Sequence, residues 1–311
     1  MPVNVTVSHA SPLLNYIPRN AWFTVSGPLD EPELFVFSNT SFHATNGTSR
    51  ANASVAFSWW GTVSHAGVWL YGIPLTDSGQ YNVVLDGTSQ DLRGFPGEFR
   101  GLGNPDLLFS ASDLFPGEHE VRVVNTGTVE GASILTIDHL VFESDLETDT
   151  TIEHNSTLCE WEPKTDNAWQ VDEDSHLPSG KNVDEFHSLT YLDRPREGSG
   201  IAIYGYLQES SASFSVTIDG HIDTPYIPNA GYGVGQGIAD VDQAVNQSER
   251  TLGLLYANMN LFSGAHTLLL ENNPISDSAT LLSVSYGVVY SEQGTTNPEP
   301  PPDDGSGASP E

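Results

Sequence analysis

The alternation of apolar and polar residues along the chain contains one stretch twice. Residues 107–125, LLFSASDLFPGEHEVRVVN, return at a constant offset of 147 as residues 254–272, LLYANMNLFSGAHTLLLEN. Each copy predicts a strand, a turn at its glycine and a second strand with apolar residues at alternate positions. The sequence therefore predicts an internal duplication. The shared positions are Leu107 and Leu254, Leu108 and Leu255, Leu114 and Leu261, Phe115 and Phe262, Gly117 and Gly264, His119 and His266, and Asn125 and Asn272.

The two halves differ in one insertion and one edge. The Asp86-Gly87 turn recurs as Asp219-Gly220 at an offset of 133, so 14 residues are inserted between this turn and the second copy of the long stretch. The alternating run at residues 55–59 has no clear partner in the second half, where the corresponding sequence is polar and rich in turn residues. We therefore expect similar cores that carry different loops.

Both halves consist of short alternating runs bounded by turn residues, with almost no helical period. This pattern predicts an all-β fold of two tandem antiparallel jelly-roll β-sandwiches related by internal duplication. The first lobe is predicted at residues 1–145 and the second at 146–292, with a short acidic segment at 143–149 between them. Residues 293–311 contain mainly proline, glycine, serine and acidic residues, so they are predicted to form a disordered C-terminal tail or stalk.

The motif order N-A-W, F-H, Y-G, L-D-G and L-x-x-G-x-H occurs in both halves or nearly so. It resembles the ectodomains of fungal single-pass surface proteins, which carry galactose-binding-domain-like jelly rolls before a low-complexity stalk and a membrane span. The resemblance covers both lobes and the tail, and it implies an extracellular or cell-surface location. It supplies no catalytic residue. The chain departs from the pattern in lacking the span and in having Ser285 where the first lobe has Asp138.

Charge narrows the classes of partner. The chain has 41 acidic and 10 basic residues and a formal net charge of -31. Nucleic acid and anionic membrane surfaces both require clustered Lys and Arg, so both are excluded, and highly acidic polysaccharides are disfavoured for the same reason. No run approaches the ~18 apolar residues of a membrane span, so no span is predicted within this segment. The predicted partner is a neutral glycan or cell-wall polysaccharide, while a protein partner or none stays open.

The cysteine count and the N-glycosylation motifs indicate in which cellular compartment the chain is found. Cys159 is the only cysteine, which excludes an intramolecular disulfide and a cysteine-based zinc cluster. Six N-x-S/T motifs, against about four expected by chance in such a composition, favour a secreted chain. The predicted glycosylation sites are Asn4, Asn39, Asn46, Asn52, Asn155 and Asn246.

Motifs of the common enzyme classes are absent from the sequence. There is no G-x-S-x-G elbow, H-E-x-x-H motif or phosphate loop, so an enzyme is disfavoured. His119 and His266 each follow a turn glycine, and we expect them to bond a loop carbonyl. Asp138 and His139 are neighbours in a predicted strand, so their side chains are expected to face opposite sides. No cofactor or metal is predicted; calcium at the acidic residues 172–174 stays open without support.

Aromatic residues are the best sign of a binding function. Trp59 and Trp60 must face opposite sides of a strand, so one of them leaves the core. Exposed aromatic planes stack on the apolar faces of sugars, whose hydroxyls bond carboxylates and amides. The alternative that these aromatics are all core, and that the insertion is an idle surface loop, stays open. The predicted ligand-binding residues are Trp60 and Tyr71 in the first lobe and Tyr226, Tyr232, Asp240 and Asp242 in the second.

Three hypotheses about the function remain, one leading and two alternatives. The leading hypothesis is a non-catalytic extracellular ectodomain that binds carbohydrate or cell wall. The first alternative is an adhesion or structural surface protein without glycan binding, and the second is a carbohydrate-active enzyme. A groove lined by aromatic side chains would favour glycan binding, and a flat glycan-coated surface would favour the adhesion or structural role. Two carboxylates that converge in a cleft would favour the enzyme.

Overall fold

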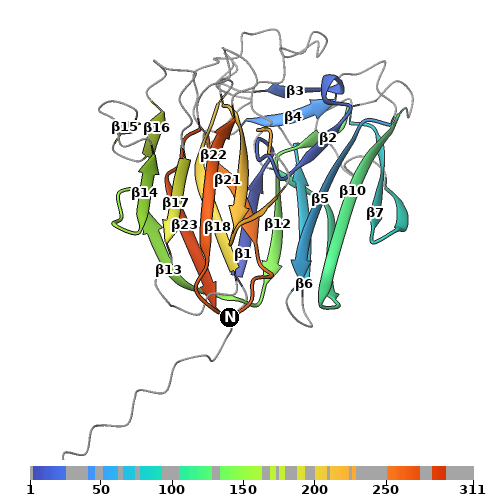
Figure 1. Cartoon of the computed structure of the whole chain (residues 1–311). Coiled ribbons are helices and arrows are strands. Elements are labelled where there is room, and N and C mark those ends of the chain that lie inside the picture. The colour runs from blue at the N-terminus through green and yellow to red at the C-terminus, as the bar shows by residue number, and fades with distance from the viewer. Residues whose placement is uncertain are drawn as a thin grey trace, which may run out of the picture.

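The computed structural model is nearly all β and consists of two β-sandwiches that lie side by side (Figure 1). Within the described residues the only helical element is a single 3-10 turn at Arg19–Ala21, and no helix is long and apolar enough to cross a membrane. The structure describes residues 3–25, 41–45, 52–61, 66–73, 78–92, 105–127, 134–162, 169–172, 175–178, 188–192, 200–208, 211–223, 226–228, 251–273 and 282–291.

The first half of the chain forms one antiparallel sandwich, called the first sandwich below. Its four-stranded sheet has the order β1-β12-β6-β9 and its five-stranded sheet the order β2-β5-β10-β7-β8. The strands are β1 (Val3–Ser8), β2 (Asn15–Ile17), β5 (Ser54–Gly61), β6 (Ala66–Gly72), β7 (Gln80–Leu85), β8 (Thr88–Leu92), β9 (Asp106–Leu114), β10 (Gly117–Gly127) and β12 (His139–Ser144).

The second half repeats this strand order and is called the second sandwich. Its sheets have the orders β13-β23-β18-β21 and β14-β17-β22-β19-β20, position for position the equivalents of the first. The fold class predicted from the sequence is confirmed. The strands are β13 (Glu147–Glu153), β14 (Cys159–Glu162), β17 (Ser188–Leu192), β18 (Gly200–Leu207), β19 (Ser213–Ile218), β20 (His221–Ile222), β21 (Thr251–Asn258), β22 (Thr267–Asn273) and β23 (Tyr286–Ser291).

A small extra sheet covers one end of each sandwich. In the first half it has the order β11-β4-β3, and its side chains form a separate apolar cluster that includes Phe23, Phe42 and Ile73. In the second half the described part is the two-stranded pair β15-β16. The strands are β3 (Trp22–Val25), β4 (Phe42–Thr45), β11 (Thr136–Ile137), β15 (Trp169–Asp172) and β16 (Ser175–Pro178).

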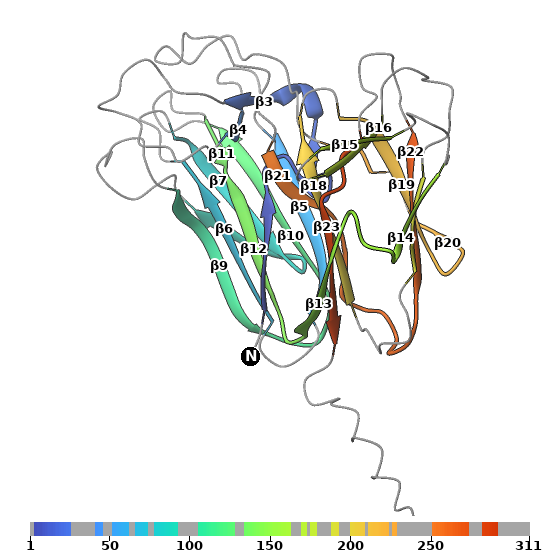
Figure 2. The same cartoon turned by 90° about the vertical axis from the view of Figure 1, so that its left-hand side faces the viewer.

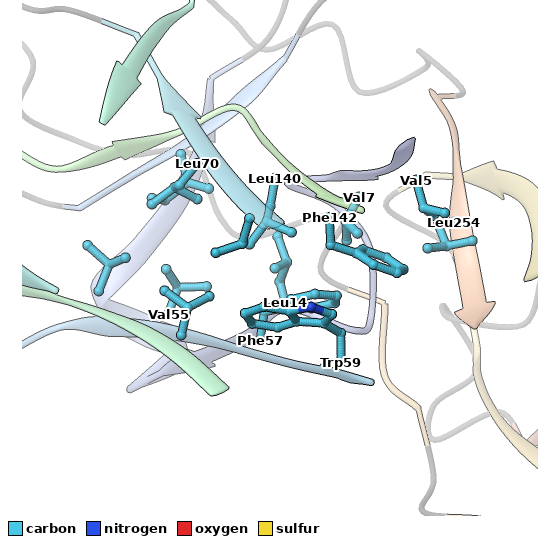
Figure 3. Close-up of a cluster of buried hydrophobic side chains, with 14 of the residues drawn as sticks. Val5, Val7, Leu14, Val55, Phe57, Trp59, Leu70, Leu140, Phe142 and Leu254 are labelled. Carbon is cyan, nitrogen blue, oxygen red and sulfur yellow. The ribbon is translucent and has the colours of Figure 1, made fainter. Parts of the chain in front are cut away.

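The largest apolar cluster crosses from one sandwich to the other. Figure 3 shows Val5 of β1 beside Leu254 of β21, with Phe142 next to them on the left. The Ser11 hydroxyl donates to the Leu254 carbonyl at 2.6 Å. Strand β1 lies next to β21 in both views (Figures 1 and 2). The open edge of the first sandwich therefore packs against the outer face of the sheet that contains β21.

The junction between the lobes is short. β12 ends at Ser144 and β13 begins at Glu147, and Leu146 between them is buried in the shared cluster. The change from one set of sheets to the other thus falls inside the predicted acidic segment, while the independent folding of residues 1–145 stays a prediction. The predicted tail at 293–311 lies outside the described residues.

Candidate functional site

The two repeated histidines hold turns together. His119 Nδ1 lies 2.7 Å from Asp86 Oδ2, and its Nε2 lies 2.7 Å from the Phe115 carbonyl oxygen. Asp86 and Gly87 both have positive φ, 48° and 79°, in the two-residue turn that joins β7 to β8. His119 therefore ties the β7–β8 turn to the β9–β10 turn, and the expected bond to a loop carbonyl is confirmed.

The second sandwich repeats this arrangement atom for atom. His266 lies 2.7 Å from Asp219 Oδ2 through Nδ1 and 2.6 Å from the Phe262 carbonyl oxygen through Nε2. Burial acts to raise the pKa of Asp219, but the hydrogen bonds from His266 and the Thr267 N–H outweigh it and hold the pKa below its ordinary value. Both histidines are accounted for by the fold, so neither marks a ligand site.

A buried histidine pair lies beneath the extra sheet of the first sandwich. His9 and His43 approach to 3.0 Å through their Nδ1 atoms, and His43 Nδ1 also lies 3.0 Å from the His9 carbonyl oxygen. Because a carbonyl only accepts, the Nδ1 proton belongs to His43, and His9 Nδ1 accepts. His9 then carries its proton on Nε2, which donates to the Ser41 hydroxyl oxygen at 2.8 Å.

This assignment argues against a catalytic serine. Ser41 receives a hydrogen bond from His9, whereas an activated nucleophile must give its proton to the base. Burial, followed by the neighbouring His43, holds the pKa of His9 well below its ordinary value, so His9 is neutral. The histidine pair is therefore a structural hydrogen-bonded unit at the base of strand β4.

Asp138 and His139 overturn one expectation. Their side chains bond each other, with His139 Nδ1 2.5 Å from Asp138 Oδ2. Asp138 lies in the gap between β11 and β12, where the alternation of a continuous strand does not apply. It is only 6% exposed, and its Oδ1 has no hydrogen-bond partner among the described residues. The two residues thus form a dyad of a buried carboxylate and a half-buried imidazole.

The second sandwich shows that the fold does not need this acid. The Asp138 N–H donates to the Tyr71 carbonyl at 2.9 Å, and its carbonyl accepts from the His9 N–H at 2.9 Å. Ser285 makes the equivalent bonds to Tyr204 and His154, at 2.8 and 2.9 Å. A buried carboxylate with an unsatisfied oxygen is unfavourable, so its presence calls for another reason. The structure offers one: Asp138 fixes the ring of His139.

His139 stands on the outer face of the four-stranded sheet beside an aromatic neighbour. Its ring stacks on Tyr71 across β12 and β6, with centroids 4.5 Å apart and planes 13° apart. Trp69, two residues earlier on β6, faces the same side. The hydroxyl of Tyr71 and the indole N–H of Trp69 have no hydrogen-bond partner in the described part of the chain. We call this group, Asp138, His139, Tyr71 and Trp69, the His139 face.

The equivalent face of the second sandwich borders the contact between the two sandwiches. Tyr204 stacks on Tyr286 with centroids 4.7 Å apart and planes 18° apart, as Tyr71 does on His139. Both tyrosines pack against the apolar cluster shared with the first sandwich. Burial raises the pKa of Tyr204, as expected for a phenol removed from water. All four rings are half-buried, but only the pair of the second sandwich packs against the shared cluster.

Trp60 lies apart from this face. Trp59 is 6% exposed and Trp60 is 37% exposed, so the prediction that one of the two leaves the core is confirmed. Trp60 projects from β5 in the five-stranded sheet, next to Glu118 on β10. It therefore lies on the opposite outer face from Tyr71, and the two predicted ligand residues cannot belong to one site.

The predicted residues of the second sandwich are only partly described. Tyr226 stacks on Phe214 at 5.6 Å, and its hydroxyl donates to Asp223 Oδ2 at 2.8 Å. It thus packs against the apolar cluster of its own sandwich. Tyr232, Asp240 and Asp242, in the insertion, lie outside the described residues.

Asn4, Asn52 and Asn155 are exposed, so a glycan would fit at each of these predicted glycosylation sites. Asn39, Asn46 and Asn246 lie outside the described residues. Across the described ranges no group of three or more His, Cys, Asp and Glu side chains is placed to hold a metal ion. Burial raises the pKa of the Cys159 thiol to about 11.

No family model and no curated protein matches the chain. Among solved structures, it is similar to a Paenibacillus xanthan lyase, with 14% identity over 86% of this chain and 25% of the lyase at a TM-score of 0.30. The chain thus spans about a quarter of that protein. It is also similar to the ANXUR2 extracellular domain from Arabidopsis thaliana, with 9% identity, coverage of 94% and 97%, and a TM-score of 0.30.

A third similar structure is the CBM36-1 domain of a multidomain xylanase from the hindgut metagenome of Trinervitermes trinervoides. The identity is 13%, the coverage is 45% of this chain and 96% of that domain, and the TM-score is 0.26. All three similarities are remote. The case for a function therefore rests on the residues of this chain.

Proposed function

We propose that the protein is a non-catalytic, extracellular carbohydrate-binding domain pair, and that the His139 face of the first sandwich is its binding site. One observation carries the proposal: a buried acid that the fold does not require holds an imidazole against Tyr71 at the surface. A fixed polar group beside aromatic planes is the combination that sugars need, since their C–H faces are apolar and their rims are hydroxylated.

The charge of the chain selects neutral sugars. A net charge of -31 repels uronates, sulfates and phosphates, whereas a neutral hexose is indifferent to it. The three exposed N-x-S/T motifs and the single cysteine suit an extracellular chain that is not disulfide-bonded.

The proposal is tested by a screen of neutral and uronate-containing oligosaccharides against the whole chain. We expect binding to at least one neutral class and none to the uronates. Tyr71→Ala and Trp69→Ala should each weaken that binding about tenfold, because each removes a stacking plane. Trp60→Ala is the matched control, since it removes an exposed aromatic from the opposite sheet. Equal loss in all three variants, or a loss explained by a lower melting temperature, would count against the His139 face.

The insertion of the second sandwich is a separate proposal. Tyr232, Asp240 and Asp242 offer a stacking plane and hydroxyl acceptors on a glycine-rich loop. If this loop binds a glycan, Tyr232→Ala should abolish the binding with no change in melting temperature, and Tyr71→Ala should leave it intact. The reverse pattern would assign all binding to the first sandwich.

Two exposed phenylalanines favour protein adhesion as a second candidate function. Phe115 is 86% exposed and Phe262 is 90% exposed, at equivalent turns of the two sandwiches. Phe115 follows the last residue of β9, and Phe262 follows β21 by a few residues. The strand pairings place the C-terminal ends of β9 and β21 at the same end of the molecule as the start of β1. Both phenylalanines therefore lie at that end. Nothing in the fold requires an apolar side chain there. A double Phe115→Ser and Phe262→Ser variant that loses cell adhesion while keeping glycan binding would support this function.

A further inference from the structure

Within the His139 face, Trp69 forms a flat floor. A methyl group added at Gly67 would lie 2.4 Å from Trp69 Cη2 and 2.9 Å from Cζ3. The six-membered ring of Trp69 therefore covers the space directly above Gly67, which only glycine leaves open. A ring this close to the backbone lies along the sheet, so its other plane faces outward. That plane is of the size that one pyranose ring covers.

Tyr71 and His139 form a wall next to this floor. They are directly paired across β6 and β12, and neighbouring strands lie about 4.8 Å apart. Their ring centroids are 4.5 Å apart and the planes are nearly parallel, so one ring lies over each strand and the two rings face each other across the gap between the strands. The ring planes are therefore perpendicular to the plane of the sheet. The wall thus rises across two strands at the end of the floor away from Gly67.

A floor closed by a wall restricts how a glycan chain can lie. A pyranose stacked on Trp69 meets Tyr71 and His139 at one side, so a glycan chain that runs along β6 leaves in the direction of Gly67. A methyl group added at Gly67 would also lie 3.2 Å from Glu143 Oε2, an acceptor for sugar hydroxyls at that end. A residue in the middle of a chain continues on both sides and would meet the wall. The shape therefore suits the last residue of a chain.

Hydrogen bonding points the same way. Asp138 accepts from His139 Nδ1, so in the neutral ring the proton lies on Nδ1 and Nε2 carries a lone pair. A terminal sugar has a hydroxyl at the position where an internal sugar has a glycosidic oxygen, and only the hydroxyl can donate. An internal residue would leave the Nε2 lone pair without a donor, and an unsatisfied polar atom in a contact weakens binding.

We propose that the His139 face recognises the terminal residue of a neutral glycan chain, with Trp69 as the stacking floor and His139, oriented by Asp138, as the acceptor for the terminal hydroxyl. This inference rests on the proposed function. It adds the part of the glycan that is bound, and it assigns Asp138 a positioning role.

The test measures dissociation constants by calorimetry on the whole chain, with laminari-, cello-, manno- and galacto-oligosaccharides of three and six residues. For any series that binds, we expect trimer and hexamer to agree within about twofold, because both have the same number of terminal residues. A site for internal residues would gain about fourfold or more, since the number of internal residues rises from one to four. A gain of more than twofold from trimer to hexamer would overturn the inference.

Variants separate the inference from the proposed function. His139→Phe keeps a ring against Tyr71 and removes the acceptor, and we expect affinity to fall about tenfold. Asp138→Asn should weaken binding less, and this loss should be absent when His139→Phe is already present, which a merely structural role of Asp138 would not produce. If binding needs Trp69 but grows with chain length and survives His139→Phe, the proposed function stands and the inference fails. If no oligosaccharide binds, both fail.

Discussion

A single buried acid distinguishes two otherwise equivalent positions of the molecule. Asp138 and Ser285 make the same pair of backbone hydrogen bonds, yet only Asp138 brings a carboxylate into the protein. The sequence alone separated Asp138 from His139, because alternation was applied across a point where the strand is interrupted. Strand breaks of this kind depend on long-range pairing, so a local pattern does not reveal them.

Replacing Asp138 by the residue of the second sandwich should not harm the fold. Asp138→Ser keeps both backbone bonds and removes a carboxylate whose Oδ1 lacks a partner. The bond to His139 is lost, but that ring is partly exposed and water can replace the partner. We expect a melting temperature equal to or above that of the unchanged chain, because the burial of a carboxylate with an unsatisfied oxygen is removed. Thermal unfolding followed by circular dichroism measures this. A fall of more than about 3 °C, roughly 1 kcal/mol or more for a chain of this size, would mean that the acid is structural after all.

The side chains of Trp59 and Trp60 should differ sharply in their contribution to stability. Trp59 packs on Phe57 with ring centroids 5.7 Å apart and is buried, whereas Trp60 projects to solvent. We expect Trp59→Ala to lower the free energy of unfolding by about 3–5 kcal/mol, and Trp60→Ala by about 0.5 kcal/mol or less. Denaturant unfolding of the two variants gives the comparison directly. Similar losses in both would contradict the assignment of Trp60 to an outer face.

At the scale of elements, the repeated turns are the features that the sequence specifies best. Each Asp-Gly turn and each histidine after a turn glycine was visible as a repeat, and the structure joins them into one unit through Asp86 and His119. What the sequence missed is β17, which occupies the sheet position of β5. Its sequence, SLTYL, does alternate: Leu189 and Tyr191 lie opposite Leu270 and Leu268, as Val55 and Phe57 lie opposite Val123 and Val121. The match was missed because the partner was sought in the polar residues after this strand. Its place is set by pairing with β14 and β22, which lie far away in the chain.

The Asp219–His266 bond makes a pH-dependent contribution to the turn unit. Because the folded-state pKa of Asp219 lies below its ordinary value, this contribution is present above the ordinary pKa and is lost as the pH falls through the folded-state pKa. The carboxylate is 43% exposed, so solvent screening keeps the contribution to about 0.5 kcal/mol or less. NMR titration should give a depressed midpoint for Asp219 that rises in His266→Gln. An unchanged midpoint in that variant would assign the shift to the Thr267 N–H alone.

At the scale of the whole molecule, two sandwiches with the same strand order contribute different surfaces to the contact between them. The first places an open edge, with β1 and Ser11, against the outer face of the second, and its own equivalent face stays at the surface. Duplication thus yields two equivalent ring pairs: Tyr204 and Tyr286 border the contact between the sandwiches, and Tyr71 and His139 lie away from it. The sequence predicts the duplication but not this contact, because residues that meet across the interface are separated by more than two hundred positions and follow no local period.

The shared cluster predicts how the chain unfolds. Leu254 and Met259 of the second sandwich are buried with Val5 and Phe142 of the first, so separating the sandwiches would expose apolar surface on both. We expect calorimetry to show one cooperative transition for the whole chain. A fragment of residues 1–145 should still fold, because most of its core lies within its own two sheets, but it should melt several degrees lower. A matched control is Leu252→Ser, since Leu252 is exposed on the same strand as Leu254 and should leave the transition unchanged. Two separate transitions, or a fragment as stable as the whole chain, would contradict this prediction. Either result would mean that the contact between the sandwiches does not stabilise them.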